Sequence, residues 1–139
     1  MRKAFYKTID HTADIGIVVK AEDLPSLFNN AALAFFDILS GLENIDDKET
    51  VKIKVEASDL EELMVNWLGE LLYLFDSDGW LFRDIQLELE NTRIIATARG
   101  ERFNPDKHEI RYYIKAVTYH MLELKQVNDH WIAKVIFDI

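Results

Sequence analysis

The sequence predicts an α+β fold in which two main helices pack on one face of a mostly antiparallel sheet. Two segments repeat apolar residues at helical spacing, whereas most of the remaining chain alternates apolar and polar residues with the period of a strand. Short turn sequences separate the alternating segments, which favours antiparallel pairing. The 139 residues match the size of one ordinary domain, so we expect a single domain over residues 1–139.

The first predicted helix lies within residues 22–41, EDLPSLFNNAALAFFDILSG. Its apolar residues recur every three or four positions. Asp23 suits the N-cap, because its carboxylate can accept a hydrogen bond from a free N–H group of the first turn. Pro25 is tolerated in that turn, where its missing N–H group costs nothing. Gly41 is expected to end the helix.

The second predicted helix starts at SDLE, residues 58–61, which matches the S-x-x-E capping box. A broad apolar stripe continues to Phe75, and SDG at 77–79 is expected to end the helix. The stripe consists of Leu60, Leu63, Met64, Trp67, Leu68, Leu71, Leu72 and Phe75. A stripe of this kind must be covered by another element, so both helices are predicted to pack on the sheet.

The first predicted strands come from alternation. Residues 51–56 and 85–90 place apolar side chains on one side and polar or charged ones on the other. ENTR at 90–93 is expected to turn the chain into the strand-like residues 94–101. Units of strand, helix and parallel strand are missing, which argues against a nucleotide-binding parallel sheet.

The last predicted strands form a hairpin. Residues 110–126 are rich in aromatic and β-branched side chains and are predicted as one long strand. VNDH at 127–130 supplies a turn, after which residues 131–139 pair back along the preceding strand. Four alternate residues are expected to point inward: Trp131, Ala133, Val135 and Phe137.

The composition limits the partners of the protein. Lys and Arg number 16 and Asp and Glu 25, giving a net charge of −9. Proteins that bind nucleic acid use Lys and Arg to displace phosphate counterions, so no direct contact with nucleic acid is expected. The acidic field would attract cations or a basic protein surface. The alternative is that the charge only keeps the protein soluble.

The sequence also limits chemistry and location. It contains no cysteine, which removes disulfides, zinc ribbons and thiol nucleophiles and fits a reducing cytosol. The N-terminus lacks the apolar run of a signal peptide, and no run approaches the roughly 20 apolar residues of a membrane span. We therefore expect a cytoplasmic protein that does not bind a membrane. The familiar nucleotide loops and hydrolase motifs are missing, which argues against a self-sufficient enzyme.

Acidic residues stand at two strand ends. DHTADIGI at 10–17 places Asp14 where a strand begins, either as an ordinary turn acceptor or as a ligand for a hard cation such as Ca²⁺. KVIFDI closes the sequence with a strand. If that strand is paired to its end, Asp138 and the α-carboxylate of Ile139 present two acids almost together. The alternative is a plain last strand with a solvated Asp138.

Two further motifs contain candidate residues. In KAVTYH, Lys115 could offset nearby acids and His120 could carry a proton or bind a metal; the alternative is a strand at the edge of the core with a hydrogen-bonded histidine. In RGER, Gly100 within a strand pattern indicates a bulge or a close approach of the backbone. Glu101 could then face a site or be an exposed charge at a sheet edge.

Taken together, these motifs resemble the archease family. DHTADIGI, SDLEELMVNWLGELLYLFD, RGER, KAVTYH and WIAKVIFDI occur in the order of that family and cover almost the whole sequence. The resemblance implies a helper rather than a catalyst. Archeases activate the RtcB-type tRNA-splicing ligase by helping it to become guanylylated from GTP, so that the ligase turns over repeatedly.

The resemblance also implies a metal site. Carried over to this sequence, the ligands of the expected cofactor, calcium, are Asp14, Asp138 and Ile139. Three carboxylates so close together would repel each other, and a cation would relieve that repulsion. The site could deliver a metal near the nucleotide of the ligase or pin the terminus. Four more residues are implied as neighbours of the site or as partner contacts: His11, Glu101, Lys115 and His120.

Two other functions stay open. A stand-alone metal-dependent hydrolase would use Asp14, His11, His120 and Asp138, although such enzymes usually need more ligands and a deep pocket. The other is a general chaperone or a modulator of proteins that process RNA or DNA.

Overall fold

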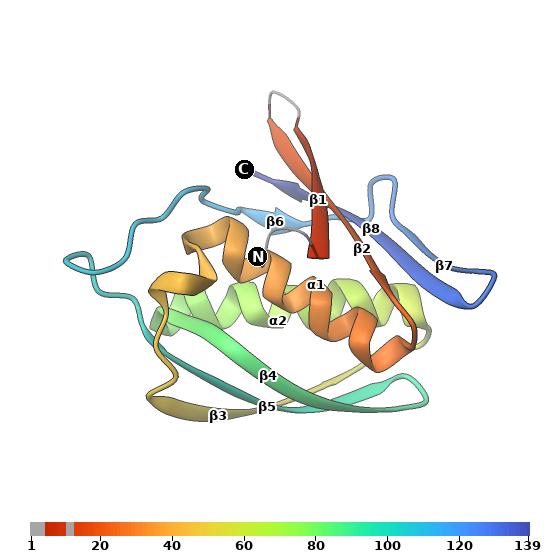
Figure 1. The fold of residues 1–139 in the computed structure, drawn as a ribbon, viewed down its shortest axis with the longest axis horizontal. Coiled ribbons are helices and arrows are strands. Elements are labelled where there is room, and N and C mark those ends of the chain that lie inside the picture. The colour runs from red at the N-terminus through yellow and green to blue at the C-terminus, as the bar shows by residue number, and fades with distance from the viewer. Residues whose placement is uncertain (1–4, 11–12) are drawn as a thin grey trace.

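Two antiparallel sheets enclose two long helices in the computed structural model, which describes residues 5–10 and 13–139 (Figure 1). The first sheet contains β1 (Tyr6–Asp10), β2 (Asp14–Ala21), β6 (Ala116–Val117), β7 (Glu123–Val127) and β8 (His130–Asp138). The second contains β3 (Glu49–Glu56), β4 (Trp80–Glu90) and β5 (Arg93–Arg102). The helices are α1 (Leu24–Ser40), the short 3₁₀ helix η2 (Leu42–Asn44) and α2 (Leu60–Asp78).

The helices lie between the sheets. Helix α1 contacts β2 and β8 of the first sheet and β4 of the second. Helix α2 contacts β6 of the first sheet and β3 of the second. The predicted α+β class, with antiparallel strands and two main helices, is confirmed. The prediction assumed a single sheet, whereas the strands divide between two sheets, each covered on one face by the helices.

Strand β8 is the centre of the first sheet. The strand order is β1-β2-β8-β6, and β7 pairs with the other end of the same edge of β8. In the second sheet β5 lies between β3 and β4. Every strand pair among the described residues is antiparallel.

The prediction of one long strand over residues 110–126 is wrong, because only the short strands β6 and β7 pair with β8 in this segment. Between them the chain turns, with Met121 at a positive φ of 53°. Thr118 attaches the start of this turn to β8, because both its N–H group and its hydroxyl donate to the carbonyl oxygen of Ile136. The predicted hairpin between the last two strands is confirmed, with Val127 opposite His130.

The limits predicted for the first helix are confirmed. Asp23 caps α1 by accepting a hydrogen bond from the N–H group of Ser26 at 2.8 Å, and Pro25 lies in the first turn. Gly41 follows the last residue with a φ of 82°, and its N–H group donates to the carbonyl oxygen of Asp37.

The second helix begins one residue later than predicted. Asp59, not Ser58, is the N-cap, and it accepts from the N–H group of Glu62. Glu62, not Glu61, returns a side-chain oxygen to the N–H group of Ser58 at 2.6 Å. Because aspartate and serine both cap helices well, the tetrapeptide alone did not fix the register. Gly79 ends the helix in the left-handed conformation, as expected.

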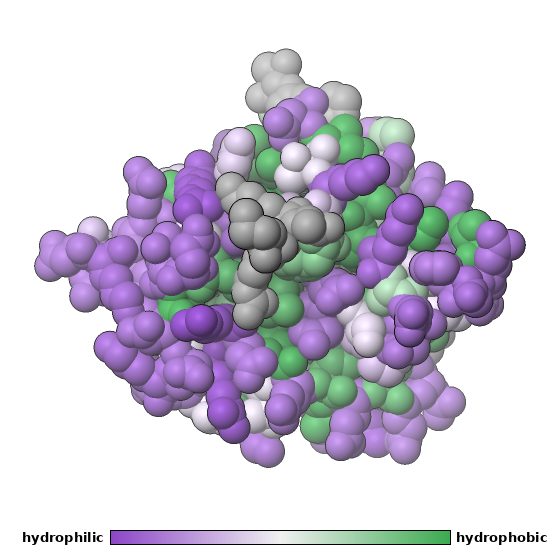
Figure 2. All heavy atoms as spheres, viewed as in Figure 1, coloured by the Kyte–Doolittle hydropathy of each residue, from purple (hydrophilic) through white to green (hydrophobic). Residues whose placement is uncertain are grey.

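Aromatic contacts join the three layers. Phe35 packs edge-on against Phe137 of β8 at 5.7 Å between ring centroids, and the adjacent Phe36 packs against Phe82 of β4 at 5.5 Å. All four side chains are fully buried. In the view of Figure 2, polar and charged residues occupy most of the periphery, whereas apolar residues show mainly towards the middle. Among the described residues, no helix combines the length and apolar character that a membrane crossing requires.

Gly100 lies at a close approach of two strands, as predicted. It stands opposite Phe82, where the register of β4 against β5 shifts before Asp84. A Cβ atom at this position would overlap the carbonyl oxygen of Leu81 and lie 2.8 Å from the Cα of Phe82. Only a residue without a side chain therefore fits the bulge.

We expect Gly100→Ala to lower the free energy of unfolding by about 3 kcal/mol, because neither backbone can move without breaking the ladder. Gly69→Ala is the matched control. Gly69 lies inside α2 and its Cβ would meet nothing within 4 Å, so alanine there should raise stability by about 0.5–1 kcal/mol. Urea unfolding followed by tryptophan fluorescence measures both changes. Equal effects of the two substitutions would contradict this account of the bulge.

Candidate functional site

Two carboxylates meet where the first sheet ends. Strands β2 and β8 pair in a register that places Asp14 directly opposite Asp138. Beyond that pair the N–H group of Ile139 donates to the carbonyl oxygen of Ala13 at 3.2 Å. On the other side of β8 the N–H group of Lys115 donates to the carbonyl oxygen of Asp138 at 2.7 Å. The last strand is therefore paired to its end, which was the condition set for the candidate acids.

The Asp14–Asp138 pair places two acidic side chains next to each other. Residues directly opposite each other in a sheet carry side chains on the same face, and like charges in such a pair destabilise it. The Oδ1 atom of Asp14 is buried and receives no hydrogen bond from any described residue. Asp138 is exposed. A buried carboxylate oxygen without a donor needs a proton or a cation, since desolvation without compensation is costly.

The donor set fits a hard cation. Ca²⁺ takes carboxylate and other oxygen ligands, and both side chains offer these. Within residues 5–10 and 13–139, no cluster of three or more Asp, Glu, His or Cys side chains is arranged to hold a metal. Ile139, the third expected ligand, follows Asp138 and is held beside Ala13 by its N–H group.

Of the other predicted residues, Lys115 adjoins the Asp14–Asp138 pair, whereas His120 lies in a separate turn. Lys115 is exposed and adjoins Asp138 through its backbone. His120 is exposed in the turn after β6, where its N–H group donates to the hydroxyl of Thr118. His11 lies outside the described residues. The hydrolase set thus has Asp14 and Asp138 together, with His120 in a separate turn.

Glu101 lies away from Asp14 and Asp138, so of its two expected roles only that of a partner contact stays a prediction. It belongs to β5, in the sheet on the opposite side of the helices from β2 and β8 (Figure 1). Its buried carboxylate accepts hydrogen bonds from Lys107 at 2.6 Å, from the N–H group of Asp46 at 2.8 Å and from His108 at 2.9 Å. Lys48 adds an ion pair at 3.6 Å. Glu101 therefore fastens the 103–108 loop.

The partners of His108 fix its tautomer. Its Nδ1 atom accepts a hydrogen bond from the N–H group of Asn104, so the proton resides on Nε2 and is donated to Glu101. Burial raises the pKa of Glu101, but the hydrogen bonds from Lys107, Asp46 and His108 outweigh burial and lower the pKa to about 2. Sequence reasoning assigned no role to His108, because its partner lies seven residues away on a different element.

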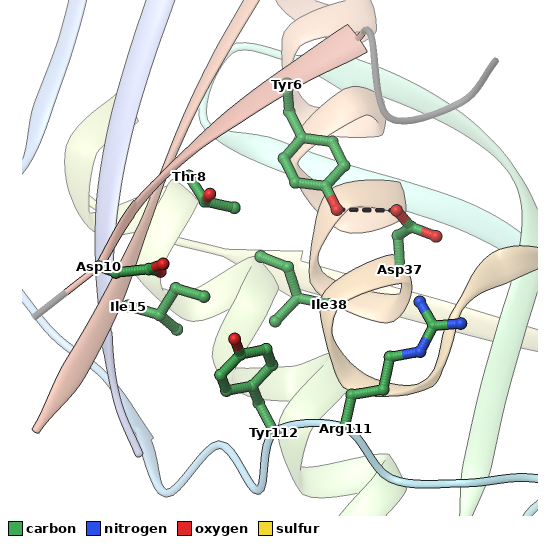
Figure 3. Close-up of a pocket in the computed structure, with 8 residues that line it drawn as sticks. All are labelled: Tyr6, Thr8, Asp10, Ile15, Asp37, Ile38, Arg111 and Tyr112. Atoms are coloured by element: carbon green, nitrogen blue, oxygen red, sulfur yellow. Dashed lines mark hydrogen bonds between the residues drawn. The ribbon is translucent and has the colours of Figure 1, made fainter.

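A separate pocket of about 250 Å³ opens beside the β1–β2 hairpin (Figure 3). The lining residues are Tyr6, Thr8, Asp10, Ile15, Asp37, Ile38, Arg111 and Tyr112. The hydroxyl of Tyr6 donates to Asp37 at 2.7 Å, and the N–H group of Leu42 donates to the other carboxylate oxygen. Burial, together with the hydrogen bond to Asp37, raises the pKa of Tyr6 well above its usual range, so the hydroxyl stays protonated.

Sequence reasoning missed this pocket. Its walls come from β1, β2, the end of α1 and residues 111–112, which are far apart in the sequence. The one available signal was Asp37, a charged residue within the otherwise apolar run AFFDIL. A buried carboxylate in such a run needs donors from elsewhere, here Tyr6 and Leu42.

Comparison with known proteins identifies relatives along nearly the whole chain. Residues 6–139 match the model of the Archease protein family. The protein archease of Methanosarcina acetivorans is 40% identical over 139 residues, covering 96% of this chain and 95% of that protein. The protein archease of Pyrococcus abyssi is 38% identical over 135 residues, covering 94% of this chain and 95% of that protein.

Solved structures share the fold. The solution structure of Methanobacterium thermoautotrophicum protein 1598 superposes with a TM-score of 0.82 at 29% identity, with both chains fully covered. The crystal structure of a Thermotoga maritima archease, described as a possible chaperone, gives a TM-score of 0.71 at 25% identity over 96% of each chain.

The Glu101 cluster predicts a defined pH dependence of stability. Because the pKa of Glu101 is about 2 in the folded protein against an ordinary 4.5, its contribution is complete above pH 4.5 and is lost as the pH falls towards 2. Glu101→Gln should lower the free energy of unfolding by roughly 2 kcal/mol at neutral pH, and this difference from the wild type should shrink between about pH 5 and pH 2. Urea unfolding across that range measures it.

Glu88→Gln is the control for this measurement, because Glu88 is an exposed residue on the neighbouring strand β4. Its stability should follow that of the wild type at each pH. A constant gap between Glu101→Gln and the wild type from neutral to acidic pH would contradict the assigned role of Glu101.

Proposed function

This chain belongs to the archease family, and on that premise we propose that it is an accessory protein that activates an RtcB-type tRNA-splicing RNA ligase. It promotes guanylylation of the ligase from GTP, so that each ligase molecule joins many RNA ends. The observation that carries the proposal is the Asp14–Asp138 pair at the end of a fully paired strand, where a buried oxygen of Asp14 accepts no hydrogen bond from the described residues.

The site acts through geometry and charge. Asp14, Asp138 and the carboxylate of Ile139 would hold a cation such as Ca²⁺, which supplies positive charge beside phosphate groups when bound. The protein's own contribution is to hold the two acidic residues opposite each other. The backbone hydrogen bonds of Lys115 and Ile139 hold the end of β8 on both edges, so the strand ends that carry the two carboxylates stay in register.

An accessory role agrees with the site better than catalysis does. Hydrolases that use a metal surround it with several side-chain ligands in a pocket. Here the described residues bring two side-chain carboxylates together, with the exposed Asp138 at the surface. The relatives are named archeases, and one is described as a possible chaperone. A partner protein completes such a site.

The first prediction of this proposal concerns activity. Asp14→Asn and Asp138→Asn should each reduce multiple-turnover RNA joining to the level of the ligase alone, because each removes one charged member of the pair. The measurement uses a matched ligase with GTP and Mn²⁺, and RNA in large excess over enzyme. Asp76→Asn, at an exposed position of α2, is the matched control and should activate like the wild type. Wild-type turnover with both site variants would reject the role of the pair.

The second prediction concerns metal binding without the ligase. Calorimetric titration with Ca²⁺ should show binding to the wild type and to Asp76→Asn, and binding weaker by more than about tenfold for Asp14→Asn. Extension of the chain by two residues beyond Ile139 should weaken binding too, because it moves the terminal carboxylate away. Unchanged calorimetry with the extended chain would remove Ile139 from the site, and no binding by the wild type would remove calcium.

A further inference from the structure

The pocket beside the β1–β2 hairpin has an acidic wall and an apolar floor. Asp10 and Thr8 line the wall formed by β1, Ile15 and Ile38 contribute apolar surface, and Tyr112 closes the side formed by the 111–112 loop (Figure 3). This combination does not suit an anionic ligand, because the carboxylate of Asp10 would repel it. It suits a long side chain with an apolar stem and a cationic end.

The charged side chains of the pocket differ in whether another described residue pairs with them. Both carboxylate oxygens of Asp37 already accept hydrogen bonds, and Arg111 reaches Glu43 at 3.5 Å. Asp10 is exposed, and no ion pair joins it to another residue within 5–10 and 13–139. The pocket therefore offers a carboxylate, with the Thr8 hydroxyl on the same face of β1, to a cation from outside.

The pocket and the carboxylate pair lie at the same end of the first sheet, on opposite faces of β2. Asp10 pairs with Ile15 across the hairpin, and Ile15 directly follows Asp14. On the other side, Tyr112 lies three residues before Lys115, whose N–H group is bonded to Asp138. The β1–β2 hairpin, the C-terminus and the segment before β6 lie close together in Figure 1. We call this end of the first sheet the carboxylate face: Asp10, Asp14, residues 112–116, Asp138 and Ile139.

The carboxylate face also carries exposed apolar and aromatic side chains. Tyr113 is 67% exposed and Tyr112 is 40% exposed. Tyrosine, methionine and arginine are enriched in protein interfaces, and tyrosine and arginine dominate their binding energy. Tyr112 lines the pocket and Tyr113 follows it in the chain, so aromatic surface adjoins the carboxylate of Asp10 and an arginine side chain would complement both.

We propose that the carboxylate face is the surface that docks on the ligase, and that the pocket receives an arginine side chain of the ligase. The guanidinium group pairs with Asp10 and stacks on the ring of Tyr112, while its stem lies along Ile15 and Ile38. Arginine fits better than lysine because its planar group serves both contacts. This inference rests on the proposed function and identifies the contact that brings the carboxylate pair to the ligase.

Titration of the ligase with this protein tests the inference, with multiple-turnover RNA joining as the readout. Asp10→Asn and Tyr112→Ala should each raise the concentration that gives half-maximal activation by about tenfold. The maximal activation at saturation should stay that of the wild type, because the carboxylate pair is intact. The wild-type concentration dependence should also weaken with added salt, and Asp10→Asn should lose much of that salt sensitivity.

Two matched controls separate docking from general surface effects. Tyr73→Ala removes a 62% exposed tyrosine from α2, and Asp76→Asn removes an exposed charge from the same helix. Both should match the wild type throughout. Urea unfolding confirms that each variant is folded, and Asp10→Asn carries the test if Tyr112→Ala is not.

The outcomes distinguish the inference from the function on which it rests. If the wild type activates the ligase and the pocket variants titrate like the controls, docking through the pocket is overturned while the proposed function stands. Pocket variants that lower maximal activation without changing the half-activating concentration also overturn docking. If the wild type does not activate an authentic ligase, the proposed function falls and the inference falls with it.

Discussion

The burial of helix α1 between two sheets is the constraint on which the rest of the structure depends. Within residues 31–39 every side chain except Leu33 is buried, so the helix has almost no face left for water in this stretch. A helix that is apolar all round needs cover on more than one side. Phe35 meets the first sheet and Phe36 meets the second, while Trp67 of α2 donates its indole N–H to the carbonyl oxygen of Phe28 on α1 at 2.9 Å. These contacts fix the separation of the two sheets.

The same packing determines where the candidate site lies. Phe137 is anchored against Phe35, and the next residue, Asp138, must point to the opposite face of the strand. In the neighbouring strand β2, Ile15 is buried, so Asp14, which precedes it, also points to the opposite face. The two carboxylates are therefore brought together by their apolar neighbours. The repulsion between them is a cost that the core offsets, and that a bound cation would relieve.

Local signals predicted the local parts of this structure. The caps of α1, the hairpin before β8 and the close approach at Gly100 depend on neighbouring residues, and each was predictable. The division into two sheets was harder to predict, although the apolar run AALAFF at residues 31–36 of α1 was a signal for it. The splitting of residues 110–126 depends on how much of the edge of β8 is free, which periodicity does not report. Likewise, only the strand order shows that Asp14 faces Asp138, and that Glu101 lies in the other sheet.

Glu101 and Asp14 both have buried carboxylate oxygens, but the partners of these oxygens differ. Glu101 is buried with Lys107 and His108 as donors from its own chain, so its charge is balanced internally and its role is to hold a loop. Asp14 is opposite another acid, and none of the described residues donates to its buried oxygen. Folding leaves that charge unbalanced where the adjoining face is acidic and aromatic. The proposed cation would balance this charge, which agrees with the proposed role as an accessory protein.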